Sequence, residues 1–71
     1  MQTGIYEHYK GNRYDVIDIA RHSESDELLV LYRTMYGDKN LWVRPFAMFF
    51  EKVEVDGMLV PRFKFIGDND E

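Results

Sequence analysis

The sequence contains no cysteine, so neither a disulfide framework nor a thiolate metal site is available to it. No stretch approaches the roughly 20 apolar residues that a membrane-spanning helix needs. Residues 1–4 carry neither a basic region nor an apolar run, which argues against a secretory signal peptide. We therefore expect a cytoplasmic protein in a reducing compartment, with no membrane contact and no bound cofactor or metal.

The chain carries little net charge outside its C-terminal end. Its formal charge is −4, and Asp68, Asp70 and Glu71 account for three of the negative charges, which leaves −1 on the body. Nucleic-acid-binding modules usually show a clear basic excess, so this balance does not demand such a partner, although it leaves room for a local basic patch. We expect one domain over residues 1–67 and a disordered acidic tail over residues 68–71.

Aromatic residues are abundant for a chain of 71 residues. There are five Phe, five Tyr and one Trp, and the stretch 36–50 holds the Trp and three of the Phe. A domain of this size buries only about 60% of the surface that its unfolded chain exposes. Because each buried ring removes a large apolar area from water, these residues can supply the core without a covalent staple.

Short apolar runs separated by turn signals predict an all-β domain. The expected strands cover residues 5–9, 13–20, 28–34 and 41–44, followed by a hairpin with arms 52–55 and 58–66 around Asp56-Gly57. Other turns are expected at residues 10–12, 21–27 and 36–40. Pro45 ends a strand, and residues 46–50 favour one 3₁₀ or α turn whose aromatic rings would close one end of a barrel.

The apolar alternation in residues 13–20 changes phase between Val16 and Ile17, which predicts a bulge or a sharp bend. Strands that serve both sides of a small barrel need such a bend. We therefore expect a small five-stranded SH3-like barrel. An OB-type barrel is the alternative, but it usually needs a longer chain and a full helix.

Several short motifs occur together in residues 4–66. They are HYKG (8–11), ARHSE (20–24), YG (36–37), LWVRP (41–45) with Met48-Phe49, and PRF (61–63) after Asp56-Gly57. As a set they resemble a small bacterial domain family of unknown function. The resemblance implies a compact bacterial domain, alone or appended to another, and brings no activity, ligand or site residue with it.

The segment His22-Ser23-Glu24, with His8, allows two interpretations. One is a hydrolytic or metal-dependent enzyme, in which these side chains supply a nucleophile and base or an open metal site. The other is a loop in which His22 orders the turn and Ser23 or Glu24 binds backbone N–H groups. Neighbouring residues point apart, and no nucleophile elbow, zinc helix or phosphate loop is present, so we favour the loop and a protein that is not an enzyme.

A second candidate site consists of aromatic and basic residues, which SH3-like domains use to bind proline-rich peptides, modified basic side chains or single-stranded nucleic acid. The full set is Tyr6, Tyr9, Tyr14, Tyr32, Tyr36 and Trp42 with Lys10, Arg13, Arg21, Lys39, Arg44 and Arg62. Trp42 and most Tyr residues can equally be core or boundary residues. Arg44 and Arg62 can pair with Asp18, Glu51 or Glu54, or one of them can bind a phosphate or carboxylate beside Trp42.

These observations favour a monomeric binding module that recognises a peptide or another macromolecule; nucleic acid is the first alternative. The residues predicted to bind the ligand are Tyr9, Lys10, Arg13, Tyr36, Lys39, Trp42 and Arg44.

Overall fold

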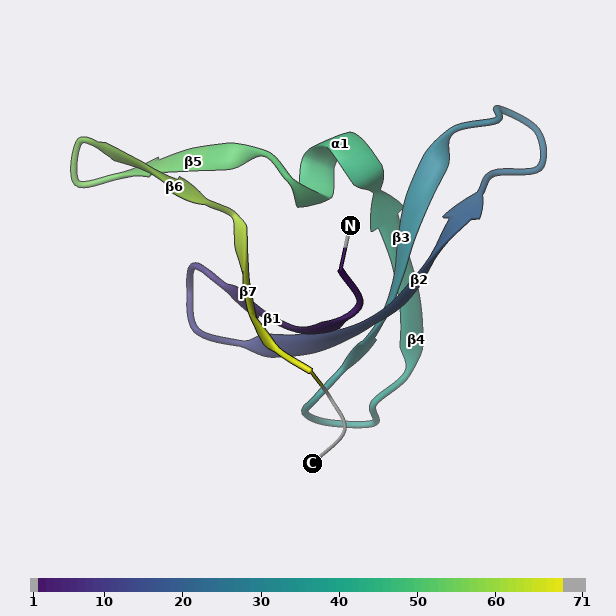
Figure 1. Cartoon of the computed structure of the whole chain (residues 1–71), viewed down its shortest axis with the longest axis horizontal. Coiled ribbons are helices and arrows are strands. Elements are labelled where there is room, and N and C mark those ends of the chain that lie inside the picture. The colour runs from purple at the N-terminus through teal and green to yellow at the C-terminus, as the bar shows by residue number, and fades with distance from the viewer. Residues whose placement is uncertain (1, 69–71) are drawn as a thin grey trace.

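The computed structural model describes residues 2–68 (Figure 1). This part of the chain contains β1 (Gly4–His8), β2 (Arg13–Arg21), β3 (Leu28–Thr34), β4 (Leu41–Pro45), α1 (Phe46–Phe49), β5 (Lys52–Val55), β6 (Met58–Pro61) and β7 (Phe63–Gly67). The predicted all-β class with one short helical turn is therefore confirmed. No helix within residues 2–68 has the length and hydropathy that crossing a membrane requires. Of the predicted acidic tail, Asp68 is exposed, and residues 69–71 lie outside the described residues.

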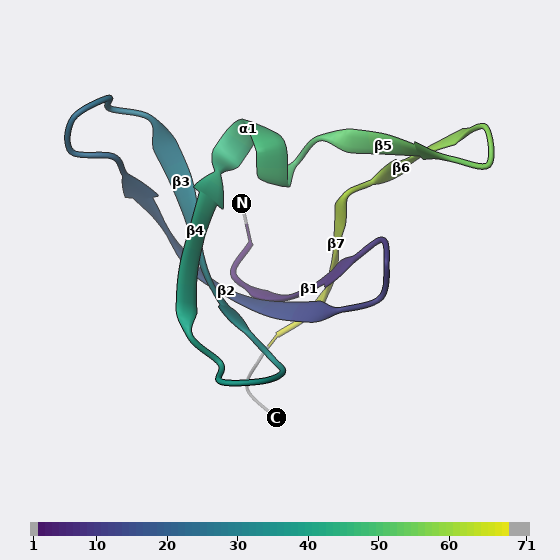
Figure 2. The same ribbon diagram turned by 180° about the vertical axis from the view of Figure 1, so that it is seen from behind.

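Five strands form one antiparallel sheet in the order β4-β3-β2-β1-β7, and β5 and β6 form a separate hairpin. The predicted SH3-like barrel is not confirmed, because β4 and β7 are the two edges of an open sheet. The physical reason lies at Arg62, which divides the predicted strand 58–66. Its backbone N–H donates to the Glu51 carbonyl and its carbonyl accepts from the Tyr9 N–H, both at 2.9 Å. The chain turns there, so β6 pairs with β5 and β7 pairs with β1 (Figures 1 and 2).

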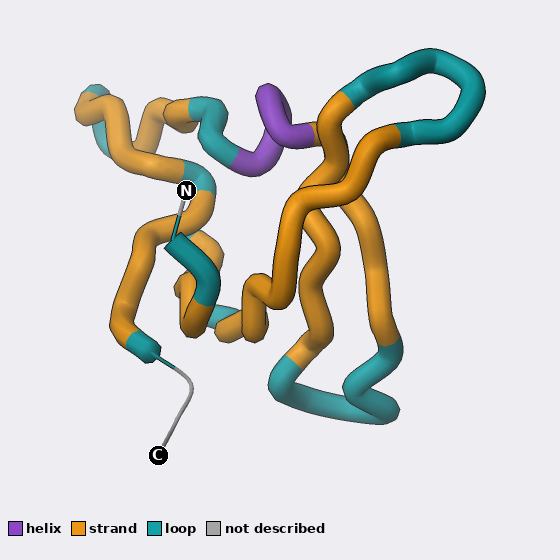
Figure 3. Tube along the Cα trace, turned by 45° about the vertical axis from the view of Figure 1, so that its right-hand side comes forward, coloured by secondary structure: helices purple, strands orange, loops and turns teal. Residues whose placement is uncertain are grey.

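The predicted irregularity in β2 is present. The pairing of β2 with β3 shifts register between Val16 and Asp18, so that Ile17 is the extra residue. The sheet curves strongly without closing into a barrel, and α1 lies over its concave side (Figures 1 and 2). The loop between β2 and β3 and the loop between β3 and β4 are both long, and they lie at opposite ends of β3 (Figure 3).

The core is a cluster of rings on the concave face of the sheet. Its buried members are Tyr6, Tyr14, Val16, Val30, Tyr32, Phe49 and Phe63. Phe49 is fully buried and its ring stacks on that of Phe63, with centroids 4.1 Å apart and planes at 3°. Tyr6 meets Phe49 edge-on at 5.4 Å. The rings after Pro45 were expected to close one end of a barrel. The sheet does not close into one, and Phe49 lies within the ring cluster.

The turn between β5 and β6 has the geometry expected from its sequence. Asp56 and Gly57 both have positive φ, 53° and 81°. Two consecutive positive values define the primed turn that matches the right-handed twist of a two-residue hairpin. Asp-Gly favours this turn because both residues tolerate the left-handed region.

Candidate functional site

The face of β4 that carries Trp42 and Arg44 is directed toward the concave side of the sheet. Alternate residues of a strand share a face, so these two side chains lie together and Leu41 and Val43 face the other way. Trp42 is paired in register with Tyr32 of β3. The antiparallel pairing of β3 with β2 places Tyr14 opposite Thr34. Three strands thus bring aromatic and hydroxyl groups to one region.

A cleft of about 390 Å³ lies over this region and is bounded by the β3–β4 loop. We call it the Trp42 cleft; its lining residues are Tyr14, Tyr32, Thr34, Tyr36, Gly37, Asp38, Lys39, Asn40, Trp42 and Arg44. Tyr14 and Tyr32 are buried, whereas Tyr36 is 48% exposed and Trp42 is 53% exposed. The sequence left open whether Trp42 is a core or a surface residue, and the structure places it at the surface.

Tyr14 joins the core to the mouth of the cleft. Its ring meets those of Tyr32 and Tyr36 edge-on, with centroids 5.3 and 5.9 Å away, and its hydroxyl lies 3.3 Å from the Tyr36 hydroxyl. Burial, and then the hydrogen bond with Tyr36, raise the pKa of Tyr14 to about 12. The Tyr14 hydroxyl is therefore protonated at neutral pH, and one of these two hydroxyls donates to the other.

The cleft also contains a partly buried cation. The Arg44 guanidinium lies 5.4 Å from the centre of the Phe63 ring, and its Nε is buried without a hydrogen-bond partner within residues 2–68. No carboxylate of the described chain lies within ion-pair distance of Arg44. Arg62 differs, because its guanidinium pairs with Glu51 at 3.2 Å. The surface ion-pair interpretation of the sequence thus fits Arg62 and does not fit Arg44.

Four of the seven residues predicted to bind the ligand line the Trp42 cleft: Tyr36, Lys39, Trp42 and Arg44. The other three lie near the β1–β2 turn. Tyr9 lines a different cavity of about 460 Å³, together with aliphatic groups that include Val60 and Pro61. Lys10 Nζ lies 5.8 Å from the centre of the Tyr9 ring, and Arg13 pairs with Glu7 at 3.0 Å. The structure therefore divides the predicted surface into two regions.

Some lining residues were not among those predicted. Tyr14 and Tyr32 belong to the wider aromatic set but not to the predicted binding residues, and Thr34, Asp38 and Asn40 belong to neither. The alternation of Tyr32 with Thr34 indicates a shared face and could have added Thr34. The pairing of Tyr14 with Thr34 depends on the β2 bulge, and no local pattern reveals that register.

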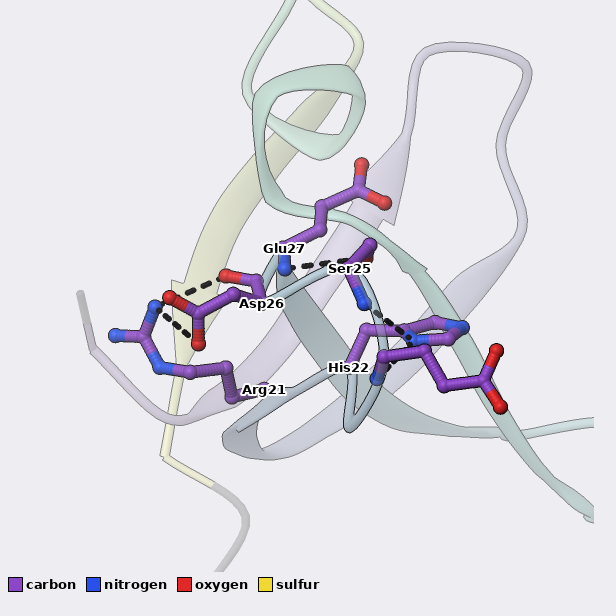
Figure 4. Close-up of polar contacts among 6 residues, drawn as sticks. Arg21, His22, Ser25, Asp26 and Glu27 are labelled. Carbon is purple, nitrogen blue, oxygen red and sulfur yellow. Dashed lines mark hydrogen bonds and ion pairs between the residues drawn. The ribbon is translucent and has the colours of Figure 1, made fainter.

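The β2–β3 loop is ordered by its own side chains (Figure 4). His22 Nδ1 accepts hydrogen bonds from the backbone N–H groups of Glu24 at 3.1 Å and Ser25 at 3.3 Å. Ser25 Oγ accepts from the Glu27 N–H at 3.2 Å. The interpretation in which His22 orders the turn is confirmed, although Ser25, and not Ser23 or Glu24, is the second side chain seen to bind the backbone.

The structure does not bring His8 to the His22 loop. His8 ends β1, beside the start of β2, whereas His22 follows the last residue of β2, so the two lie at opposite ends of that strand (Figure 1). His8 Nδ1 accepts from the Lys10 N–H at 3.1 Å, and its ring packs edge-on against Phe63. Within residues 2–68, no three His, Asp or Glu side chains are arranged to hold a metal ion.

His8 makes stability depend on pH. Burial lowers the pKa of His8 below its ordinary value of 6.5, and the positive charges of Arg44, Arg62 and Lys10 lower it further. In the window below pH 6.5 the unfolded chain therefore binds more protons at this site than the folded chain, so stability falls as the pH falls. We expect the urea midpoint of His8→Gln to fall less than that of the wild type between about pH 7 and pH 5. Parallel curves for the two proteins would contradict this account.

Comparison with known proteins agrees with the resemblance seen in the sequence motifs. Residues 4–65 match the DUF1653 family, described as a protein of unknown function. A crystal structure of a DUF1653 protein from Bordetella bronchiseptica is similar to this chain, with a TM-score of 0.88 and 30% sequence identity. The similarity covers 100% of this chain and 94% of the Bordetella chain. No curated protein matches the sequence. Since the family match covers most of the chain, this protein belongs to the DUF1653 family.

Proposed function

We propose that this domain is a non-enzymatic binding module whose Trp42 cleft receives a peptide segment of another protein. The observation that carries the proposal is the exposure of Trp42 and Tyr36 in one cleft, although the same molecule buries Tyr6, Tyr14 and Tyr32. Half-exposed rings beside a cavity are the usual means of holding proline, apolar or cationic side chains. The lack of cysteine suits a monomer acting in a reducing, cytoplasmic environment.

The size and charge of the cleft favour a peptide over nucleic acid. A volume of about 390 Å³ accommodates a small number of side chains. The whole chain carries a charge of −4, so long-range attraction of a polyanion is weak. A peptide backbone is neutral, so the negative charge of the chain does not oppose its approach.

Trp42→Ala tests the proposal directly. Since about half of the ring is exposed, we expect the free energy of unfolding to fall by only about 1–2 kcal/mol, well below the cost of truncating a core aromatic. Peptide binding, measured by NMR titration with a degenerate peptide library, should be lost. Tyr9→Ala is the matched control, because it removes an exposed ring from the other cavity. Equal binding by Trp42→Ala and the wild type would contradict the proposal.

Single-stranded nucleic acid is the second candidate, because Lys39 and Arg44 flank the two exposed rings. Stacking of bases on rings, with cations on the phosphates, is a common mode of single-strand binding. The two candidates differ in their response to salt. Nucleic-acid affinity falls steeply as salt is raised, whereas peptide binding to an aromatic cleft changes little. A titration at two salt concentrations, with an oligonucleotide and with the peptide library, separates them.

A further inference from the structure

The structure contains two partly buried arginines that differ in one respect. The guanidinium of Arg62 has a carboxylate partner in Glu51, at 3.2 Å. Arg44 has none within the described chain. In both arginines the Nε–H is buried without an acceptor in residues 2–68, so the ion pair is the difference between them. A buried donor that lacks a partner costs stability unless a water, an ion or a ligand satisfies it. Arg44 lines the Trp42 cleft, so a bound ligand can reach it from that cleft.

The surroundings of Arg44 favour a negative group. Its other neighbours include the Phe63 ring, which offers no hydrogen-bond acceptor of its own. Burial lowers the pKa of His8, and the positive charges of Arg44, Arg62 and Lys10 lower it further, so His8 adds no positive charge beside Arg44 at neutral pH. The hydroxyls of Tyr14 and Tyr36 share one hydrogen bond, which leaves one of their two protons to donate to a ligand.

We infer that the ligand of the Trp42 cleft carries a carboxylate that Arg44 binds, so the peptide recognised is an acidic one. This inference rests on the proposed function. The planar guanidinium presents parallel N–H donors that match a carboxylate. The side chain next to the acidic residue then packs on the exposed rings of Trp42 and Tyr36. Within the chain itself, the Glu51 carboxylate binds the guanidinium of Arg62.

A carboxylate fits better than a phosphate. Asp38 also lines the cleft, and its charge opposes a phosphomonoester, which carries nearly two negative charges at neutral pH, more than a singly charged carboxylate. The lining has one guanidinium, that of Arg44, with Lys39 as the second cation. Sites for phosphomonoesters usually add a cluster of arginines or the N–H groups of a helix N-terminus.

The test compares two degenerate pools of blocked octapeptides, one with Glu fixed at the central position and one with Gln. The protein is labelled with ¹⁵N, and the Arg44 Nε–H, the Arg62 Nε–H and the Trp42 indole N–H are followed by NMR. We expect the Glu pool to bind about tenfold more tightly than the Gln pool, as a charge-assisted hydrogen bond would provide. The signals of Arg44 and Trp42 should shift, and the pKa of His8 should rise because the bound carboxylate offsets the charge of Arg44.

Arg44→Lys and Arg62→Lys are matched variants, since both keep the charge and lose the planar fork. The first should abolish the preference for the Glu pool and the second should leave it intact. Equal binding of both pools at Trp42 would overturn the carboxylate assignment and leave the proposed function in place. Absence of any shift at Trp42 with either pool would overturn both. Tighter binding of inorganic phosphate or of oligothymidylate than of the Glu pool would overturn the assignment in favour of a phosphate-bearing ligand.

Discussion

Phe49→Ala is expected to lower the free energy of unfolding by about 3–5 kcal/mol, a large share of the stability of a domain this small. Phe49 is 0% exposed, stacks on Phe63 at 4.1 Å and contacts Tyr6 and Tyr32. Truncation removes the apolar surface and leaves a cavity that the neighbouring rings, held by three strands, cannot fill. Urea denaturation followed by far-UV circular dichroism measures the loss.

Phe50→Ala is the control for this prediction, because Phe50 is the next residue and has the same side chain. Its ring is 39% exposed, and it lies at the edge of the cluster, 6.2 Å from Tyr6. We expect a loss of about 1–2 kcal/mol, since only part of the ring is transferred to water. If the two variants unfold at the same urea concentration, Phe49 is not the centre of the core.

Gly4→Ala is expected to cost roughly 2–4 kcal/mol, from strained backbone and forced separation of two strands. Gly4 has φ +133°, a conformation that residues with a side chain rarely adopt. A Cβ at this position would lie 2.5 Å from the Gly67 carbonyl oxygen and 3.2 Å from Phe65. The obstacle is backbone, so β7 would have to move away from β1. Thermal unfolding measures the effect.

Gly57→Ala provides the comparison for Gly4→Ala. Gly57 also has positive φ, +81°, but a Cβ there meets nothing within 4 Å. Only the backbone preference is lost, and we expect a cost of about 1 kcal/mol. Equal losses for the two variants would mean that the close approach of β1 and β7 contributes nothing to the requirement for glycine.

Much of the local structure could be predicted because it depends on neighbours in the sequence. The phase change at Ile17 identified the β2 bulge, Asp56-Gly57 identified its turn, and Pro45 with the apolar run after it identified the helical turn. The division of the last strand at Arg62 could not be predicted in this way. It depends on two backbone hydrogen bonds to distant residues, Tyr9 and Glu51, while the local alternation continues unbroken.

The candidate site was predictable only where one strand and its turn contribute to it. Tyr36, Lys39, Trp42 and Arg44 lie within one short stretch and form part of one cleft. Tyr9 is also a tyrosine, and its exposure is similar to that of Tyr36, but it lines another cavity. The order of the strands in the sheet decides which turns lie close together. Composition identifies such groups, and only the topology tells which of them act together.

The pairing of β1 with β7, which joins Ile5 to Gly67, has a consequence for how the chain reaches its structure. Until the segment of β7 docks, the edge of β1 that β7 covers has no strand partner. Phe63, which completes the ring cluster, arrives with that segment. Closing so long a loop is entropically unfavourable and slows folding. The domain therefore keeps an open strand edge and an incomplete core until its last strand docks, and this partly folded state is the one most exposed to aggregation.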